Sequence, residues 1–465
     1  MPLGGSTDDE QALGVPALTQ PSPRGRGLIA DRDFDERERW PEERWRRYQW
    51  RRLRAVLRTA YDSLPFYRKR LDAVGLAPES IRSIEDYSQV PLLRKGEVLA
   101  AMRERGTYAV GMETIERAGP WALGMTSGTL GTAFLSFPQG WRRETGDALR
   151  RAYWWAGLRP GMRMMMAAPA WHSLALQESW VAQRLGAECV IPWGTFLPRF
   201  AESFLDTLLD LRPAFVSLFL PMLYGLLAEC RRRGQSPDRA FAGVQSVLVV
   251  GAPLTPGARQ NLKDELGVGD LFEGAGNPEG LIAMECEQHA GHHCFVDTCY
   301  VEIIDAETGR PLPPGRRGSV VVSTLARHGS VHLRYEAEDV GEIFAEPCPC
   351  GRTWPRLEIY DRRANRFRAG GRELLWYDVR ECLDEVPELI GTPFAVIRRP
   401  GGSPALRIAM EQLGRWETGS LGPRIEALAG QRLGVPLQLE WVEGLPERWK
   451  GVTVIDEKEW EAAHV

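Results

Sequence analysis

Residues 125–134, MTSGTLGTAF, combine hydroxyl side chains with glycines, a composition that suits a phosphate-binding loop. Glycines let backbone N–H groups come close to phosphate oxygens, and hydroxyl groups can donate to the same oxygens. No Gly-Lys-Ser/Thr sequence follows, so the segment is not a Walker A motif. It predicts a site for a phosphate-bearing ligand, with an ordinary loop as the alternative. The residues concerned are Thr126, Ser127, Gly128, Thr129 and Gly131.

A second set of residues could bind a metal ion. The segment ECEQHAGHHC at 285–294 is followed further along the chain by CPCGR at 348–352. Three thiolates and one imidazole are the donor set of a closed, tetrahedral zinc site, and we expect a structural zinc ion here. Free thiols in an exposed turn, or a redox pair, are the alternatives. The predicted ligands are Cys286, His293, Cys348 and Cys350, with His289, His292 or Cys294 as replacements for His293.

Composition excludes several classes of protein. The chain has 465 residues, enough for about two to four compact units with a buried core. Its 58 basic and 62 acidic residues give a net charge of -4, which offers no general attraction to nucleic acid or anionic membranes. Eight cysteines are too few for a disulfide scaffold. Without a signal peptide or an apolar run of about 18 residues, we expect a cytoplasmic protein.

The elements that must position these residues alternate between strand and helix. Apolar runs at 162–170, 188–194, 215–219 and 246–254 predict strands, and residues 175–186 and 203–213 predict the helices between them. Strand, helix and strand at this spacing indicate parallel βαβ units and an α/β sheet.

Other patterns flank this α/β region. Residues 33–71 carry aromatic and apolar side chains at spacings of three and four, which predicts an amphipathic helix whose stripe packs in the core. Residues 299–323 read as two strands around a Gly/Pro turn, which indicates a β-rich subdomain. After residue 363 the chain restarts with short segments typical of a small α+β domain.

The loop at 125–134 resembles the TSGTTG loop of the adenylate-forming superfamily, which includes acyl-CoA synthetases, adenylation domains and luciferases. Six further segments stand with it in the family order along the chain, and the nearest resemblance is to phenylacetate-CoA ligases over residues 40–456. These segments are the amino-terminal signature at 61–98, GAPL at 251–254, AGNPE at 275–279, RYEAED at 334–339, DRR at 361–363 and RWKGVTVID at 448–456.

The resemblance implies a site for ATP, Mg²⁺ and coenzyme A. Two anions must meet when a carboxylate attacks the α-phosphorus, so cations and N–H dipoles must screen them. The implied nucleotide residues are Ser127, Gly128, Thr129 and Gly131 for the β- and γ-phosphates, Glu279 for magnesium, Asp339 with the nearby Arg362 for the ribose, and Gly251 with Ala252 for adenine.

The resemblance also implies catalytic and acid-binding residues. Lys450 would bridge the carboxylate and the α-phosphate, with Glu279 and Thr129 completing the catalytic set. A solvated surface lysine is the alternative for Lys450. Tryptophan near the acid pocket favours an aromatic or flat carboxylic acid. The pocket residues are Trp171, His172, Ser173 and Gly276, although a buried His172 without a substrate role is an equal alternative.

From these patterns and the resemblance we expect an α/β fold: α/β subdomains and a β-rich subdomain, then a small hinged α+β domain. Residues 1–28 are rich in Gly, Pro and Ser and are expected to form a disordered tail. The adenylate-forming domain would span 29–361, with its β-rich part at about 295–361, and the mobile carboxy-terminal domain would span 362–465. Rotation of that domain about Arg362 would build the acceptor channel.

The expected activity is formation of an acyl-adenylate followed by transfer to coenzyme A. A carrier-protein thiol or an amine is the alternative acceptor, as in specialised metabolism. Leu130 replaces a hydroxyl residue of the family loop and cannot donate to a phosphate, which favours a different alternative, a non-catalytic paralogue that binds nucleotide or acid. The sequence leaves the oligomeric state open, with a homodimer as one option.

Overall fold

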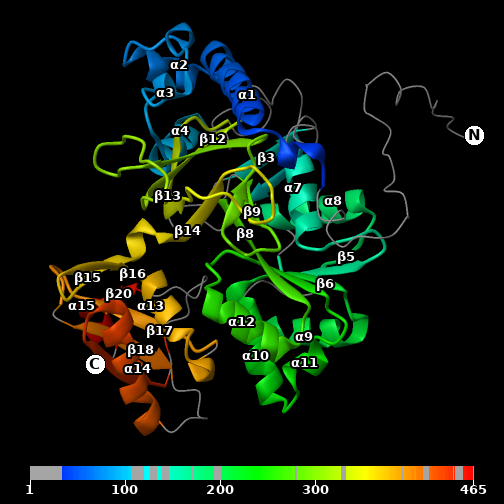
Figure 1. Ribbon diagram of the computed structural model, residues 1–465, viewed down its shortest axis with the longest axis vertical. Helices are drawn as coiled ribbons and strands as arrows, with labels where there is room; N and C mark the ends of the chain where they lie inside the picture. The colour runs from blue at the N-terminus through cyan, green and yellow to red at the C-terminus, as the bar shows by residue number, and fades with distance from the viewer. Residues whose placement is uncertain are drawn as a thin grey trace, which may run out of the picture.

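The computed structural model describes residues 34–105, 120–125, 134–138, 146–168, 172–192, 200–277, 280–325, 331–389, 391–403, 405–411, 418–443, 445 and 454–463. The tail predicted at 1–28 lies outside them. Figure 1 shows the N-terminal helices at one end, a large sheet across the middle, and the C-terminal elements at the other end.

The helical pattern predicted for residues 33–71 is present, but it forms several helices rather than one. A 3-10 helix, η4 (Glu36–Arg39), precedes α1 (Glu42–Ser63), and a separate helix α2 (Pro65–Asp72) follows. Leu64 between them is extended, with φ −119°, because the ring of Pro65 disfavours helical backbone at the preceding residue. The face of α1 that includes Trp45 and Leu53 is buried, as its stripe predicted. The remaining elements of this region are η5 (Pro78–Ser80), α3 (Ile84–Tyr87) and α4 (Lys95–Arg105).

The predicted parallel sheet is confirmed. Five strands pair in the order β5-β4-β6-β7-β8, and all four pairings are parallel. The strands are β4 (Arg163–Met166), β5 (Glu188–Val190), β6 (Phe215–Phe219), β7 (Ser246–Val250) and β8 (Asp270–Asn277). The helices are α7 (Gly146–Trp155), α8 (Ser173–Leu185), α9 (Ala201–Leu211), α10 (Leu220–Arg232), α11 (Pro237–Ala240) and α12 (Pro256–Leu266).

The β-rich region continues this same sheet through antiparallel strands. The order runs β8-β9-β10-β14-β13-β12-β11, with β1 (Leu93–Arg94) parallel to β13. The strands are β9 (Gly280–Glu285), β10 (His292–Cys294), β11 (Cys299–Ile304), β12 (Gly318–Thr324), β13 (Tyr335–Ile343) and β14 (Arg356–Arg362). A separate pair, β2 (Pro120–Met125) and β3 (Phe134–Pro138), flanks residues 126–133 of the predicted phosphate loop.

The carboxy-terminal residues form a small α+β unit, as predicted. A hairpin of β15 (Arg366–Ala369) and β16 (Arg372–Leu375) follows the 3-10 helix η7 (Arg363–Asn365). A four-stranded sheet has the order β19-β18-β17-β20. The strands of this sheet are β17 (Phe394–Arg398), β18 (Leu406–Glu411), β19 (Leu437–Val442) and β20 (Val454–Asp456). The helices of the unit are α13 (Trp376–Leu383), η8 (Pro387–Leu389), α14 (Thr418–Leu433) and α15 (Glu457–Ala463).

The carboxy-terminal unit contacts the start of α12 through Asp384. Thr255 Oγ1 donates to Asp384 Oδ2 at 2.6 Å, and Asn261 Nδ2 donates to the Asp384 carbonyl at 2.9 Å. A Cβ on Gly257 would lie 2.8 Å from that carbonyl oxygen, so a side chain there would force the two helices apart. Asp384 also pairs with Arg380 one turn earlier, within the carboxy-terminal unit.

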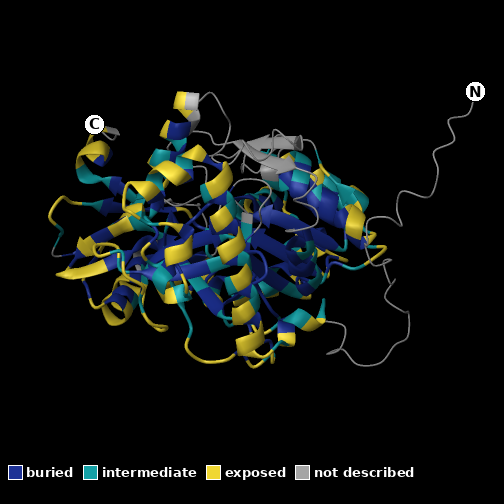
Figure 2. Cartoon of the chain, turned by 90° about the horizontal axis from the view of Figure 1, so that it is seen from above, coloured by how far each residue is buried: buried dark blue, intermediate teal, exposed yellow. Residues whose placement is uncertain are grey.

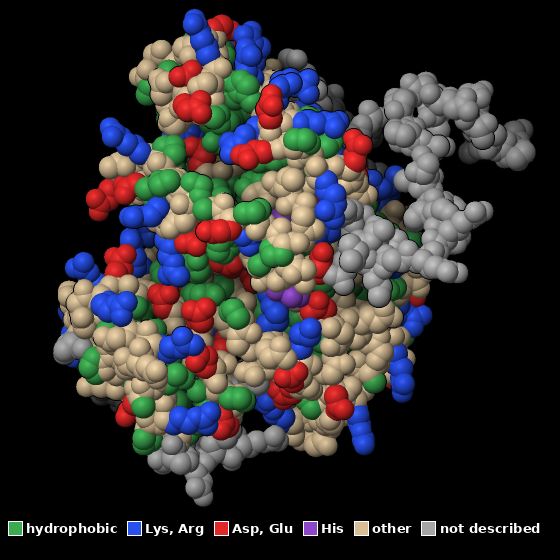
Figure 3. Space-filling model, viewed as in Figure 1, with side chains coloured by type: hydrophobic (Ala, Val, Ile, Leu, Met, Phe, Trp, Pro, Cys, Tyr) green, Lys and Arg blue, Asp and Glu red, His purple; other side chains and the backbone are tan. Residues whose placement is uncertain are grey.

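Figure 2 shows buried residues concentrated in the strands and exposed residues on the outer helices and loops. Basic and acidic side chains are interspersed over the face in Figure 3, in keeping with the near-balanced charge. Among the described helices, none is long and apolar enough to cross a bilayer.

Candidate active site

The loop after β7 packs tightly against the end of β6. The last residues of these strands, Phe219 and Val250, are register partners, and Val250 also pairs with Gly274 of β8. Gly251 has φ +85°, and a Cβ there would lie 2.5 Å from Phe219 Cδ1. Glycine is therefore required for both its backbone angle and its contact. This places Gly251 and the buried Ala252, the predicted adenine residues, directly after the pairing of Val250 with Gly274 of β8, the strand that also carries Gly276.

His172 lies at the start of α8 and contacts the same phenylalanine. Its ring stands edge-on to Phe219, with centroids 6.2 Å apart. Its Nδ1 accepts a hydrogen bond from Leu174 N at 3.1 Å, so the side chain caps the helix that begins at Ser173. Phe219 thus connects the predicted acid pocket with the predicted adenine loop. An N-cap role is a reason for His172 to be present without any contact to substrate.

Asp339 and Arg362 are brought together by β13 and β14. They are register partners, and Arg362 Nε lies 2.9 Å from Asp339 Oδ1. Arg362 also donates from Nη1 to the Ala337 carbonyl at 3.1 Å. The Asp339 side chain is 8% exposed and the Arg362 side chain 35%, so the aspartate is held by the sheet while the arginine reaches solvent. A carboxylate fixed in this way can accept hydrogen bonds from a sugar diol.

Asp361 is a residue beside the predicted hinge to which the sequence assigned no role. Its Oδ1 accepts hydrogen bonds from Arg362 N at 2.7 Å and from Asn365 Nδ2 at 2.5 Å. Its Oδ2 accepts from Tyr377 N at 3.1 Å, at the start of α13. Burial, with the nearby charge of Asp339, raises the pKa of Asp361 to about 6. Asp361 therefore ties both sides of the hinge together. No local sequence signal identified this role, because Tyr377 lies 16 residues further along the chain.

The predicted zinc ligands converge. The ligand atoms of Cys286, His293, Cys348 and Cys350 all lie within 4.8 Å of one another. Cys286 Sγ is 3.7 Å from Cys348 Sγ, and Cys350 Sγ is 3.3 Å from His293 Nε2. His293 Nδ1 lies 3.1 Å from the Trp354 carbonyl, the outer contact that orients a metal-binding imidazole. Three sulfurs and one nitrogen at this spacing fit a tetrahedral zinc ion.

The structure distinguishes among the histidines that were predicted as alternative zinc ligands. The alternative histidines, His289 and His292, contact other groups, which favours His293 as the fourth member of the cysteine cluster. Part of the predicted site lies outside the described residues, namely Thr126, Ser127, Gly128, Thr129, Gly131, Trp171, Glu279 and Lys450.

Comparisons with known proteins point to one family. Residues 109–326 match the family model described as AMP-binding enzyme. The phenylacetate-coenzyme A ligase of Thermus thermophilus is 28% identical over 380 residues, covering 79% of this chain and 81% of the relative. The phenylacetate-coenzyme A ligase of Aromatoleum evansii is 25% identical over 389 residues, covering 81% and 84%.

Solved structures share the fold. A 2-hydroxyisobutyryl-CoA ligase in the postadenylation state, in complex with 2-HIB-AMP, has a TM-score of 0.81 and 22% identity, covering 92% of this chain and 93% of that one. The anthranilate CoA ligase AuaEII, in complex with anthranoyl-AMP, has a TM-score of 0.56 and 14% identity over 80% and 77%. The chain is thus similar to AMP-binding enzymes over residues 109–326 and to curated phenylacetate-coenzyme A ligases over about four-fifths of its length, and it shares the fold of a solved CoA ligase.

Proposed function

We propose that the protein activates a carboxylic acid with ATP and transfers the acyl group to coenzyme A. The acid's oxygen attacks the α-phosphorus, and pyrophosphate leaves. The coenzyme A thiol then loses its proton, its sulfur attacks the acyl carbon, and AMP leaves. The observation that carries this proposal is the similarity to curated acid-CoA ligases over about four-fifths of both chains.

Four of the described residues support the proposed nucleotide site, and the rest of the site is assigned from the sequence. Asp339, held by Arg362, would accept hydrogen bonds from the ribose hydroxyls, and Gly251 with Ala252 would lie along the adenine. Bound Mg²⁺, held by Glu279, would neutralise charge on the phosphates. The loop residues Ser127, Gly128, Thr129 and Gly131 would hold the β- and γ-phosphates, with Thr129 also assisting catalysis.

The proposed acid is aromatic. His172 and Phe219 present ring edges and faces near the adenine loop, and aromatic rings pack well against such surfaces. Trp171, Ser173 and Gly276 complete the proposed pocket. A carrier-protein thiol or an amine is the alternative acceptor. The surface residues that recognise an acceptor follow no pattern that identifies the acceptor from the sequence.

The test is pyrophosphate release across a panel of aryl and short aliphatic acids, with and without coenzyme A. We expect release that requires an acid, with a thioester formed when coenzyme A is present. Acid-dependent release without a thioester would replace coenzyme A by a carrier protein or an amine. No release with any acid, from folded protein that binds ATP, would favour the non-catalytic binding protein.

We further propose the domain division and a structural zinc ion. Residues 29–361, with the β-rich part at about 295–361, would form the adenylation domain, and residues 362–465 would rotate about Arg362 between half-reactions. The Asp384 contact with α12 would have to break in that rotation. Zinc bound by Cys286, His293, Cys348 and Cys350 would fasten the segment before β14 to the β9–β10 hairpin.

Replacing Asp339 tests the proposed ribose site. We expect Asp339→Ala to raise the KM for ATP about 10-fold or more, because each lost charge-assisted hydrogen bond is worth about 1.5–3 kcal/mol. The measurement is the ATP dependence of pyrophosphate release. Glu307→Gln, at an exposed turn, is the charge-matched control and should leave this KM unchanged. An unaltered KM in folded Asp339→Ala would exclude the ribose role.

A further inference from the structure

Three acidic and imidazole side chains form a second compact set of donor atoms in the sheet. Glu273 on β8, Glu285 on β9 and His292 on β10 are 7%, 3% and 1% exposed. His292 pairs with Glu285, and Gly274 pairs with Met284, so the three residues form one row across adjacent strands. Their ligand atoms lie within 4.8 Å of one another.

His292 directs an unused nitrogen into this row. Its Nδ1 lies 3.2 Å from the Leu357 carbonyl, so Nδ1 donates to that carbonyl and Nε2 is the nitrogen left to bind another group. Within the described part of the chain, that buried Nε2 has no hydrogen-bond partner. Glu273 Oε2 is 3.7 Å away, beyond the usual hydrogen-bond range of about 2.7–3.2 Å. A buried polar atom left in this state is costly unless something binds it.

The separation suits two ligands of one metal ion. Zinc lies about 2.0–2.2 Å from nitrogen and oxygen ligands, so two atoms of a tetrahedral set are roughly 3.4 Å apart. The contact between His292 Nε2 and Glu273 Oε2 is close to this spacing. The Leu357 carbonyl would then be the outer contact that orients the imidazole.

The charges around the row also call for a cation. Glu358 Oε1 lies 3.9 Å from His292 Nδ1 and adds a third carboxylate. Arg259 Nη2, from α12, lies 2.5 Å from Glu285 Oε1 and supplies one positive charge. His289 lies 3.3 Å from Glu285, but it also pairs with Asp270 at 3.1 Å. The charges of His289 and Asp270 therefore offset each other and leave the charge of the row unchanged. Buried carboxylates are normally paired or bound to a metal, and one divalent ion would balance the remaining excess.

We propose that Glu273, Glu285 and His292 bind one divalent first-row transition-metal ion. Imidazole combined with carboxylates favours such ions over calcium and magnesium, which prefer all-oxygen sites. This site is distinct from the cysteine cluster. Side chains alternate along a strand, so Cys286 and His293 lie on the opposite face of the hairpin from Glu285 and His292. Accordingly, His293 contacts Trp155 of α7, whereas Glu285 contacts Arg259 of α12.

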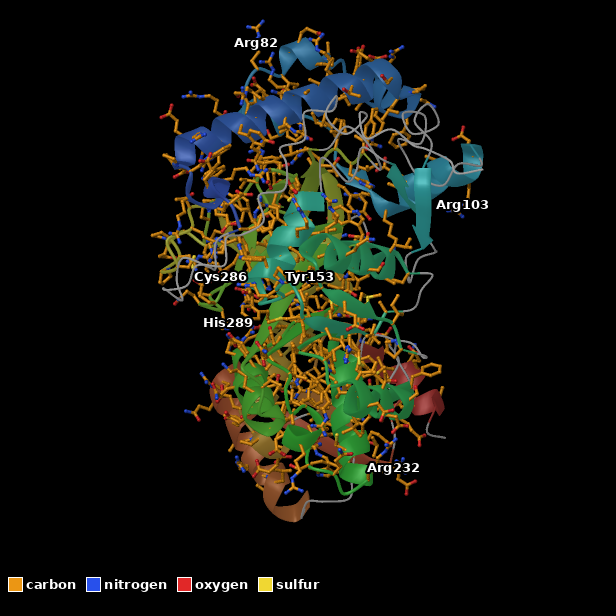
Figure 4. All side chains as sticks on the ribbon, turned by 90° about the vertical axis from the view of Figure 1, so that its right-hand side faces the viewer. Arg82, Arg103, Tyr153, Arg232, Cys286 and His289 are labelled. Atoms are coloured by element: carbon orange, nitrogen blue, oxygen red, sulfur yellow. The ribbon has the colours of Figure 1, made fainter. Side chains whose placement is uncertain are left out.

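The ion would brace the loop that we assign to adenine. Glu273 Oε2 accepts a hydrogen bond from Leu254 N at 3.0 Å, at the end of the GAPL segment. Glu285 Oε2 in turn accepts from Glu273 N at 2.7 Å. Figure 4 labels Cys286 and His289, which lie at the same side of the molecule between the N-terminal helices and the C-terminal unit. Fixing Glu273 therefore fixes the base of the loop that carries Gly251.

Cobalt binding to full-length protein tests this proposal independently of adenylation. Co²⁺ bound by thiolates gives an intense charge-transfer absorption, whereas Co²⁺ bound by nitrogen and oxygen does not. Cys348→Ser weakens the cysteine cluster. We expect this variant to retain one Co²⁺ per chain without the charge-transfer band, and Cys348→Ser/Glu273→Gln to lose it. Cys348→Ser/Glu178→Gln, which alters a buried carboxylate outside the row, should retain it.

Two outcomes would overturn the proposal. Cys348→Ser protein that is folded but binds no Co²⁺ would show that the row is only a hydrogen-bonded network. Binding that survives both Glu273→Gln and His292→Gln would place the ion elsewhere. Should Cys348→Ser fail to fold, the stoichiometry of otherwise wild-type protein decides: Glu273→Gln should bind one Co²⁺ fewer than wild type, and equal binding would refute the site.

Discussion

Lys450→Ala is expected to lower acid-dependent pyrophosphate release by about 10²–10³-fold, the cost of removing one electrostatic contact to a developing charge. Attack of a carboxylate on the α-phosphorus brings two anions together. A lysine that bridges them stabilises the transition state more than it stabilises either reactant. The expected loss is therefore in kcat, with little change in the affinity for ATP.

The second half-reaction provides an internal control for this variant. Supplied with preformed acyl-adenylate, Lys450→Ala should still transfer the acyl group to coenzyme A, because that step needs no attack on phosphorus. Lys458→Ala, on the exposed side of α15, should behave like wild type in both assays. Equal loss of both half-reactions, or no loss of the first, would remove Lys450 from the proposed catalytic role.

Loss of zinc from the cysteine cluster is expected to destabilise the protein by several kcal/mol. Zinc binds the folded ligand set far better than the unfolded chain, so its binding free energy adds to the free energy of unfolding. Wild-type protein should melt at a lower temperature after chelation and recover on addition of zinc. Metal analysis before and after chelation measures the ion directly.

Cysteine variants separate zinc loss from ordinary packing loss. Cys348→Ser should already melt at a low temperature and show little further effect of chelator through this cluster. Cys230→Ser removes a buried cysteine of α10 that does not belong to the cluster. This variant should keep the zinc and the full response to chelator. If chelation had equal effects on Cys348→Ser and wild type, the cluster would not be a zinc site.

Local patterns predicted the fold where each element depends on its own residues. All five residues of β6 are buried, and a short run that is apolar except for Ser217 identified the strand. The break between α1 and α2 was also written locally, in Pro65, but the aromatic periodicity that continues past it outweighed that signal. The pairing of β10 with β14 joins residues 292–293 to residues 356–357. No local pattern specifies such a distant pairing, so the union of the two sheet regions was not predictable.

The candidate site shows the same division. Donor chemistry alone selected Cys286, Cys348 and Cys350, but choosing among neighbouring histidines required knowing which face of β10 each one occupies. Glu273 lies on another strand, and its place beside Glu285 depends on strand register, so the second donor set was missed. The alternation of Glu285 with Cys286 and of His292 with His293 was the available clue.

That alternation also bears on how the β9–β10 hairpin folds. A slip of one residue turns every side chain of a strand to the opposite face. A slipped β10 would present His292 to the cysteines and His293 to the carboxylates, and both imidazoles would lose the carbonyls that now orient them. Only one alignment satisfies both faces together. The register of the hairpin is thus specified from both of its faces at once, and a misaligned β10 would lose both sets of ligands together.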